Sequence, residues 1–259
     1  MFATIGSLAE DLCLGRGSAT AIRECLMKRL YVRGVRAARK ALESTHLLEA
    51  MARSDRRIVR WLRSLFSIYD SNDMVALDVP WWTYAAVDKV SAFLVSRQGM
   101  ARVFEYGSGA STVWLAKRAA EVVSVEHDER FWESMQPIFA EHANVEVLLV
   151  PPATASGKAG EVRSGRAGCE QSDFAAYVSA IDRRDGKFDL VIVDGRSRDA
   201  CLAAAMPRLA GDGMIVFDNS NRRRYRQAIK ASGMTATRLR GLAPALPYPS
   251  ETTLMRMHS

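Results

Sequence analysis

The chain has 259 residues, 48% of them apolar and 25% charged, so it can bury a sizeable core in one large domain or in one domain with an appendage. Its net charge of +7 is uneven, because residues 1–63 hold 13 Lys and Arg against 6 Asp and Glu while the remainder is balanced. The first residues lack the segments of a signal peptide and no apolar run reaches the ~20 residues that span a bilayer, so we expect a cytoplasmic protein.

Residues 1–70 are predicted to form a basic helical appendage. Residues 18–68 contain one Gly and no Pro, and apolar side chains recur at three- and four-residue spacing among arginines. This pattern is typical of a helical cap with solvated arginines, and it also suits contact with an anionic membrane, a partner protein or nucleic acid. The polar segment 69–73 is the predicted boundary with a second domain at residues 71–259.

The second domain opens with a proline and two tryptophans. Pro80 suits the first turn of a helix that runs to about Leu94. Trp81 and Trp82 are expected either to wall a cofactor or substrate pocket or to seal the appendage against the domain.

From residue 102 onward, predicted strands and helices alternate. The strands cover 102–106, 121–126, 144–150, 187–194 and 213–218, and the helices cover 110–120, 128–142, 172–184, 197–210 and 221–232. Such alternation predicts an α/β fold in which helices cover both faces of a parallel sheet. The segment 151–171, rich in Pro, Gly, Ala and Ser, is expected to be a long loop at the ligand-binding edge, either a lid or a surface insertion.

The segment 103–111 reads Val-Phe-Glu-Tyr-Gly-Ser-Gly-Ala-Ser and predicts a cofactor-binding loop. Two glycines after a strand let the backbone turn sharply and bring its N–H groups to a ligand, and the following helix N-terminus adds partial positive charge. A dinucleotide loop would have a third glycine where this chain has Thr112, and Glu105 would repel its pyrophosphate. A cationic ligand with a ribose near Glu126 fits better, and S-adenosylmethionine is such a ligand.

Four segments resemble the class I S-adenosylmethionine-dependent methyltransferases: the loop from Glu105 to Gly109, the acid Glu126, the strand that Asp194 closes, and the strand that ends in Asp218-Asn219. The resemblance implies a three-layer, doubly wound, mostly parallel seven-stranded sheet with an antiparallel C-terminal strand, completed by 234–240 and 251–257. We expect these residues to contact the cofactor: Glu105, Tyr106, Gly107, Ser108, Gly109, Ser111, Thr112, Glu126, His127 and Asp194.

Asp194, Asp218 and Asn219 are the candidate catalytic residues, because they follow the fourth and fifth strands beside the expected methyl group. They also resemble the residues that hold a divalent cation in catechol-type O-methyltransferases, and that resemblance implies a Mg²⁺ site. The lysine expected three residues after Asp194 is replaced by Ser197, so the base stays open. The alternative is that Asp218 caps the next helix and Asn219 bonds the backbone or the substrate.

Six arginines beyond the fourth and fifth strands favour an anionic substrate. We expect substrate contacts from Arg196, Arg198 and Arg222, and from Tyr248 in the proline-rich connection 241–250; Arg223, Arg224 and Arg226 belong to the same group.

The predicted function is therefore methyl transfer from S-adenosylmethionine to an oxygen, or as second choice a nitrogen, of a small molecule. Nucleic acid is not expected as substrate, because the fourth strand ends in Val-Asp-Gly-Arg and the chain has no Pro-Cys pair. The alternatives are an aminopropyltransferase, an NAD-dependent oxidoreductase, and a non-catalytic cofactor sensor that docks through its basic helices.

Overall fold

The computed structural model describes residues 30, 33–35, 37–67, 70–166 and 168–258. The predictions made for residues 1–29, which cover the first part of the appendage, lie outside this set. Within the described residues, no helix has the length and apolar character that a transmembrane span requires.

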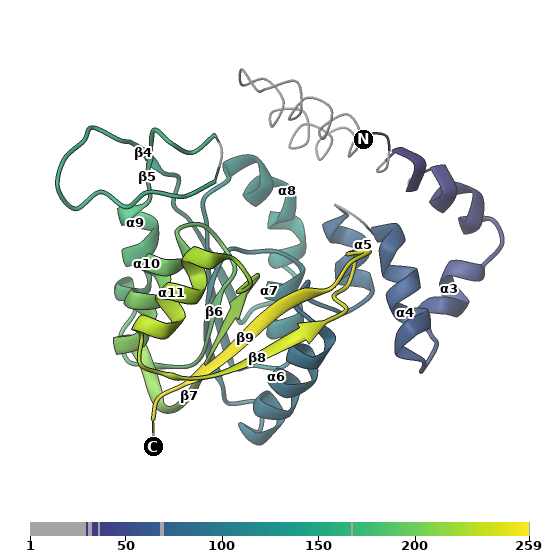
Figure 1. The fold of residues 1–259 in the computed structure, drawn as a ribbon. Coiled ribbons are helices and arrows are strands. Elements are labelled where there is room, and N and C mark those ends of the chain that lie inside the picture. The colour runs from purple at the N-terminus through teal and green to yellow at the C-terminus, as the bar shows by residue number, and fades with distance from the viewer. Residues whose placement is uncertain (1–29, 31–32, 36, 68–69, 167, 259) are drawn as a thin grey trace.

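A seven-stranded sheet forms the centre of the molecule, with strand order β3-β2-β1-β6-β7-β9-β8 (Figure 1). The first five strands in this order run parallel, and β9 is antiparallel to both of its neighbours. This confirms the predicted fold class, including the antiparallel strand near the C-terminus. The strands are β1 Arg102–Tyr106, β2 Glu121–Glu126, β3 Val145–Leu149, β6 Phe188–Val193, β7 Leu209–Asp218, β8 Thr235–Gly241 and β9 Ser250–Arg256.

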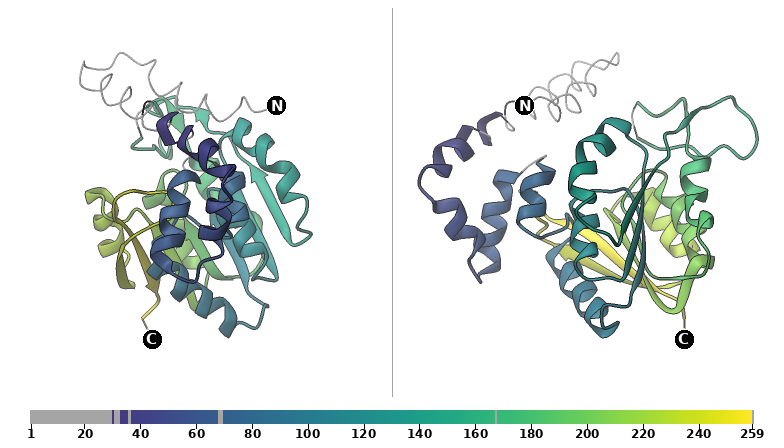
Figure 2. Two further views of the ribbon diagram at one scale, coloured as in Figure 1. Left: turned by 90° about the vertical axis from the view of Figure 1, so that its right-hand side faces the viewer. Right: turned by 180° about the vertical axis from the view of Figure 1, so that it is seen from behind.

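Helices cover both faces of the sheet (Figures 1 and 2). Successive strand residues point to opposite faces, so Val103 joins one core and Phe104 the other. Both faces are buried, which explains why these strands read as continuous apolar runs. One face is covered by α6 Tyr84–Ser96, α7 Ala110–Ala116 and α8 Glu129–Phe139, and the other by α9 Ala175–Val178, α10 Arg198–Ala205 and α11 Arg223–Ala231.

Several helix boundaries differ from the sequence predictions. The helix expected from Pro80 begins instead at Tyr84, because the preceding segment is held along the sheet edge: the Thr83 N–H donates to Thr252 Oγ1, and the Tyr84 N–H donates to the carbonyl of Leu242. Two other helices end early in 3-10 turns, namely η3 Ser179–Arg183 after α9 and η4 Met206–Arg208 after α10.

The expected long loop after β3 contains a small hairpin. Two short antiparallel strands, β4 Ala153–Thr154 and β5 Ser172–Asp173, close its base. The segment between them has neither helix nor strand in its described residues, as predicted.

The described part of the appendage is helical, with α3 Leu47–Ala52, α4 Arg57–Ser64 and the 3-10 turn η2 Leu65–Ser67. Helix α4 contacts the connection between β8 and β9: the Trp61 indole N–H donates to the Leu246 carbonyl at 3.0 Å, and the Ala245 N–H donates to Ser64 Oγ at 3.0 Å. The appendage therefore contacts the domain at the end of the sheet where β7 and β8 finish.

A helix replaces the break that was expected at 69–73. Asp70 accepts a hydrogen bond from the Asp73 N–H and caps α5 Ser71–Ala76. A bidentate ion pair from Arg63 to Asp73 joins α4 to α5. Met74 of α5 packs with Val79 against Ala110, the first residue of α7. The helix that follows the glycine loop is thus supported directly by α5.

We expect Met74→Ala to lower the free energy of unfolding by about 2–5 kcal/mol, because Met74 is fully buried and its loss leaves a cavity between α5 and α7. Met100→Ala is the matched control, since Met100 is 74% exposed and its loss should cost less than about 0.5 kcal/mol. Urea unfolding measures both. Equal stability of the two variants would contradict the packing of α5 on α7.

Candidate active site

The carboxyl ends of β2, β1, β6 and β7 lie side by side and carry the candidate residues. The registers place Tyr106 beside both Val125 and Val193, and Val193 beside Phe217. The Gly107 N–H donates to the Val125 carbonyl, and the Asp194 N–H donates to the Tyr106 carbonyl. Glu126, Asp194 and Asp218, each at or next to a strand end, thus come together at one edge, where open α/β sheets bind ligands.

Gly107 is required by the close approach of two loops. Its φ of 93° lies in the left-handed region, and a Cβ there would lie 2.9 Å from the Cα of Gly195. The glycine loop and the loop after β6 therefore touch backbone to backbone.

Glu105 is completely buried beneath the glycine loop. Its carboxylate accepts hydrogen bonds from Ser111 Oγ at 2.5 Å, Thr112 Oγ1 at 2.6 Å and Ser124 Oγ at 2.6 Å. Thr112 Oγ1 in turn accepts from the Gly109 N–H. Thr112, at the position of the missing third glycine, thereby ties the loop to Glu105. Burial raises the pKa of Glu105 to about 7, and the three hydroxyls oppose that rise.

Glu126 at the end of β2 accepts hydrogen bonds from the glycine loop and from its own following turn. One oxygen accepts from the N–H and the hydroxyl of Ser108, both at 3.1 Å, and the other from the N–H groups of His127 and Asp128. Burial opposes ionisation, but these bonds and the His127 ring together lower the pKa of Glu126. Glu126 is therefore a fixed carboxylate beside the glycine loop.

His127 connects the second and fourth strand ends. Its Nε2 accepts a hydrogen bond from Arg196 Nε at 3.0 Å, so the ring proton is on Nδ1, which lies 2.7 Å from a Glu126 oxygen. Since β1 lies between β2 and β6, the contact between His127 and Arg196 crosses the strand that carries the glycine loop.

Asp194, directly after β6, and Asp218, the last residue of β7, are neighbouring strand-end carboxylates. Burial raises the pKa of both, that of Asp218 to about 7, and the charge of Asp194 contributes to the Asp218 shift. Asp218 is held by Thr252 Oγ1 at 2.7 Å and by Asn219 Nδ2 at 2.6 Å. Glu105 and Asp218 are 0% and 3% exposed, whereas the Asp194 side chain is 23% exposed, so Asp194 is the carboxylate of this group that a ligand can reach.

Arg198 is the buried cation of this site. Its Nη2 lies 2.7 Å from Asp194 Oδ1, and its other N–H groups donate to backbone carbonyls of the two strand-end loops and, at 3.3 Å, to Asn219 Oδ1. The side chain is only 10% exposed. Arg198 was predicted to contact substrate, but the structure places it beneath the surface as a link between β6 and β7.

The segment before α6 closes another side of the site. Trp82 is fully buried and packs edge-on against Trp114 of α7. Burial raises the pKa of Asp194, and the indole N–H of Trp82 is one of the groups that oppose that rise. Trp82 belongs to the apolar core between α6, α7 and the sheet, whereas Trp81 is 39% exposed.

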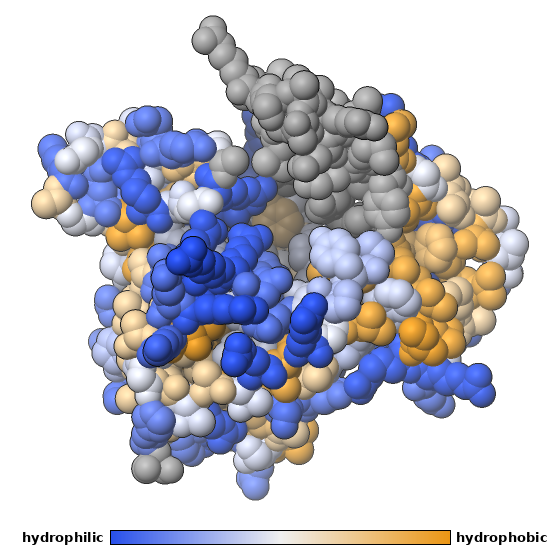
Figure 3. Space-filling view, in the orientation of Figure 1, coloured by the Kyte–Doolittle hydropathy of each residue, from blue (hydrophilic) through white to orange (hydrophobic). Residues whose placement is uncertain are grey.

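The remaining predicted residues lie in varied positions. The Tyr106 ring points into the core, where its hydroxyl donates to the Val178 carbonyl, so only its backbone faces the loop. Arg222 is exposed and close enough to Asp194 to lower its pKa. Tyr248 is 61% exposed on the connection that follows β8. Figure 3 shows the hydrophilic surface over α11, to which the exposed residues Arg222, Arg223 and Arg226 belong.

The donor set at Asp194, Asp218 and Asn219 does not fit a divalent cation. Arg198 occupies an oxygen of Asp194, while Asn219 and Thr252 occupy both oxygens of Asp218. A positive guanidinium beside the site would also repel the metal. Among the described residues, no three His, Cys, Asp or Glu side chains group in a way that would hold a metal ion. The Mg²⁺ site implied by the resemblance is not supported.

Sequence reasoning missed three residues that shape the site. Thr252 of β9 donates a hydrogen bond to Asp218, and Ser124 of β2 donates one to Glu105. The buried hydroxyl of Tyr177 lies where a side chain at position 195 would begin, so only glycine fits there. Each of the three lies far in sequence from the residue that it contacts. Only Ser124 carried a signal, as a polar residue in the middle of an apolar strand.

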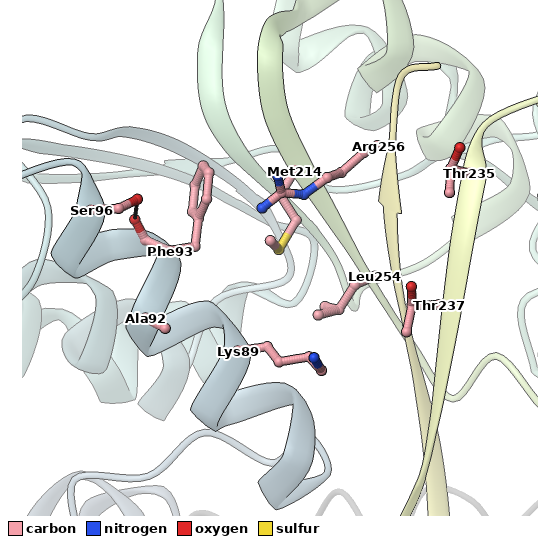
Figure 4. Close-up of a pocket in the computed structure, with 9 residues that line it drawn as sticks. All are labelled: Lys89, Ala92, Phe93, Ser96, Met214, Thr235, Thr237, Leu254 and Arg256. Carbon is pink, nitrogen blue, oxygen red and sulfur yellow. Dashed lines mark hydrogen bonds between the residues drawn. The ribbon is translucent and has the colours of Figure 1, made fainter. Parts of the chain in front are cut away.

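A groove lies away from these strand ends. It measures about 460 Å³ and runs between α6 and the strands β8 and β9 (Figure 4). Met214 in the middle of β7 and Arg256 at the end of β9 line it, and both lie four residues along their strands from Asp218 and Thr252.

Residues 104–220 match the model of a protein family described as a methyltransferase domain. This match covers the glycine loop, Glu126, Asp194 and Asp218 in the predicted order. Together with the observed strand order, it confirms the predicted resemblance to the class I S-adenosylmethionine-dependent methyltransferases and their Rossmann-like fold. A search of curated protein sequences finds no match.

Solved structures similar to this chain include an rRNA methylase from Streptococcus thermophilus. It is 13% identical, the match covers 66% of this chain and 96% of that one, and the TM-score is 0.46. A methyltransferase-like protein from Silicibacter pomeroyi is 22% identical over 66% of this chain and 87% of its own, with a TM-score of 0.43. Magnesium protoporphyrin IX methyltransferase from Synechocystis PCC 6803, solved with bound SAM, is 13% identical over 79% and 86%, with a TM-score of 0.45. At these values the substrates of those proteins say nothing about the substrate of this chain.

Gly107→Ala should destabilise the protein more than Gly99→Ala does. Both glycines have left-handed φ angles, 93° and 76°, so each substitution costs about 1–2 kcal/mol of backbone strain. Only at Gly107 does the new Cβ meet a neighbouring backbone, which adds about 1–3 kcal/mol, whereas nothing lies within 4 Å at Gly99. Urea unfolding of the two variants gives the difference, and equal losses would contradict the close approach of the two loops.

Stability should fall as the pH rises from about 4 to about 7.5. The folded-state pKa of Asp218 is raised from 3.8 to about 7, so its contribution is complete below the unfolded pKa and is lost as the pH passes through the folded one. Asp218→Asn removes this titration and keeps the shape, so its stability should fall less. Urea unfolding at several pH values gives the free energy of unfolding of each variant, and Asp55→Asn, at an exposed position, is the control that should follow the wild type. The same pH dependence in Asp218→Asn and in the wild type would contradict the prediction.

Proposed function

We propose that the domain binds S-adenosylmethionine over the glycine loop and transfers its methyl group to an oxygen of a small anionic molecule. Nitrogen is the second choice of acceptor. The observation that carries the proposal is the set of four carboxylates, Glu105, Glu126, Asp194 and Asp218, gathered around one glycine loop with Arg198 as the buried cation among them.

The residues present fit this cofactor. Gly107 leaves no side chain between the loops, and Glu126 is an ionised carboxylate that can accept hydrogen bonds from two ribose hydroxyls once Ser108 gives up its contact. Glu105 and Asp194 supply negative potential where a cationic centre would lie. A pyrophosphate would be repelled by the same groups, which argues against NAD.

The protein's chemical task is small. Bound S-adenosylmethionine supplies a methyl carbon that its sulfonium has already activated, so the chain has to align the acceptor and remove its proton. Asp194 suits the role of base, because it is partly exposed and its oxygen is oriented by Arg198. A hydroxyl group needs a base to remove its proton, whereas a neutral amine can attack through its lone pair without one. The presence of a base therefore favours an oxygen acceptor.

Arginines beside Asp194 support an anionic substrate. Arg222 is exposed and acts on Asp194 through its charge, and Arg196 reaches the same edge through His127. Guanidinium groups bind carboxylates and phosphates through paired hydrogen bonds. A substrate with one hydroxyl and one anionic group could thus contact Asp194 and Arg222 together.

S-adenosylhomocysteine should bind the purified protein in calorimetry, and Glu126→Ala should weaken that binding at least about tenfold. The loss follows from two hydrogen bonds to a charged acceptor at about 1.5–3 kcal/mol each. Glu133→Ala, an exposed carboxylate on α8, is the matched control and should bind normally. Unchanged affinity in Glu126→Ala, or tight binding of NAD instead, would overturn the proposal.

Labelled methyl transfer should occur to hydroxylated carboxylates or phosphates in preference to their uncharged amides and to simple amines. Arg222→Ala should raise KM for the anionic acceptor about tenfold or more and change kcat less, because it removes one charge-assisted contact. Lys230→Ala, an exposed cation farther along α11, is the control. Preference for neutral amines would contradict the proposed substrate class.

A further inference from the structure

We infer that Arg198 is the built-in cation of this site: its guanidinium fills an oxygen-lined cage between the ends of β6 and β7 and takes the place that a divalent metal would occupy. Arg198 is in this view a positioning residue, which orients the carboxylate of Asp194 without touching the substrate. The inference rests on the proposed function for its role in catalysis, whereas the cage itself is a property of the described residues.

Five oxygens surround the guanidinium. Two are side-chain oxygens, Asp194 Oδ1 at 2.7 Å and Asn219 Oδ1 at 3.3 Å. Three are backbone carbonyls, those of Asp194 at 2.6 Å, Gly195 at 3.0 Å and Asp218 at 2.5 Å. Carboxylate, amide and carbonyl oxygens are the ligands that Mg²⁺ and Ca²⁺ prefer, so the cage has the composition of a hard-cation site.

The cage is arranged for an arginine in particular. Nε and both terminal nitrogens all donate hydrogen bonds, and the side chain is 10% exposed above the Tyr225 ring, whose centroid lies 5.8 Å from Cζ. A planar guanidinium reaches several carbonyls at once, and it keeps its charge when it is buried. The ammonium of a lysine could not make the same set of bonds.

The charges around Asp194 make this cation necessary. Glu105 of β1 and Asp218 of β7 lie on either side of it in the sheet, and both add negative charge. Arg198 from α10 and Arg222 before α11 oppose them, and Arg198 does so from within the protein. Without Arg198, three carboxylates would share one edge with no buried counterion.

The consequence is a site that needs no metal. Arg198 already holds the oxygens that a metal would use, and it links the two loops that carry Asp194 and Asn219. Removal of the guanidinium should therefore do two things: it should loosen the orientation of Asp194, and it should open the cage to a divalent cation.

Mn²⁺ binding to the full chain, measured by electron paramagnetic resonance and calorimetry without cofactor, tests the inference. We expect negligible Mn²⁺ binding by the wild type and at least about tenfold tighter binding by Arg198→Ala. The double variant Arg198→Ala with Asp194→Asn should lose the gained binding, since it lacks a cage oxygen. Arg198→Lys should exclude Mn²⁺, because it keeps the charge.

Arg222→Ala is the matched control, because it removes an exposed arginine beside the same carboxylate and should gain no Mn²⁺. Arg198→Gln is a second neutral variant in case Arg198→Ala does not fold, and circular dichroism reports folding of each. The inference is overturned if the wild type binds Mn²⁺ and loses it in Asp194→Asn, or if a folded neutral variant gains no Mn²⁺. S-adenosylhomocysteine binding by the same wild-type preparation reports on the proposed function separately.

Discussion

The architecture of this site depends on the cost of gathering carboxylates at the edge of a parallel sheet. Glu105 and Asp218 are almost fully buried, which disfavours their ionisation, and the charge of Asp194, which lies between their strands, adds to that effect on both. The chain offsets that cost locally. Three hydroxyls bond Glu105, Thr252 and Asn219 bond Asp218, and Arg198 pairs with Asp194. These contacts come from α7, β2, β9 and α10, and they join the elements around the glycine loop into one unit.

Much of the fold could be predicted from the sequence because its signals are local. Apolar strands buried on both faces, the Gly-Ser-Gly turn and acids at strand ends each depend on a few consecutive residues. β1 and β2 match their predicted limits at Arg102–Tyr106 and Glu121–Glu126. The resemblance implied a mostly parallel seven-stranded sheet, and the observed strand order places Asp194 beside the glycine loop, as expected.

What could not be predicted depends on contacts between distant residues. Arg198 was one of six arginines expected to favour an anionic substrate, and only the fold shows that it turns inward to five oxygens. Pro80 suited a helix start, but Thr83 is held by Thr252, which lies far along the chain. The polar segment at 69–73 looked like a loop, yet Asp70 caps a helix there and Arg63 pairs with Asp73. A polar residue that satisfies a partner far away in sequence has the same local signature as one that faces water.

The central claim is that buried carboxylates at the strand ends select a cationic cofactor. The most direct measurement compares S-adenosylmethionine with S-adenosylhomocysteine by calorimetry between pH 6 and pH 8, because the two ligands differ in the charge at sulfur and share their other ionisable groups. Glu105 and Asp218 have pKa values raised to about 7, so the site gains negative charge as the pH rises. The account predicts that the affinity for S-adenosylmethionine rises several-fold relative to that for S-adenosylhomocysteine. A ratio of affinities that stays constant over this range, or that falls, would contradict it.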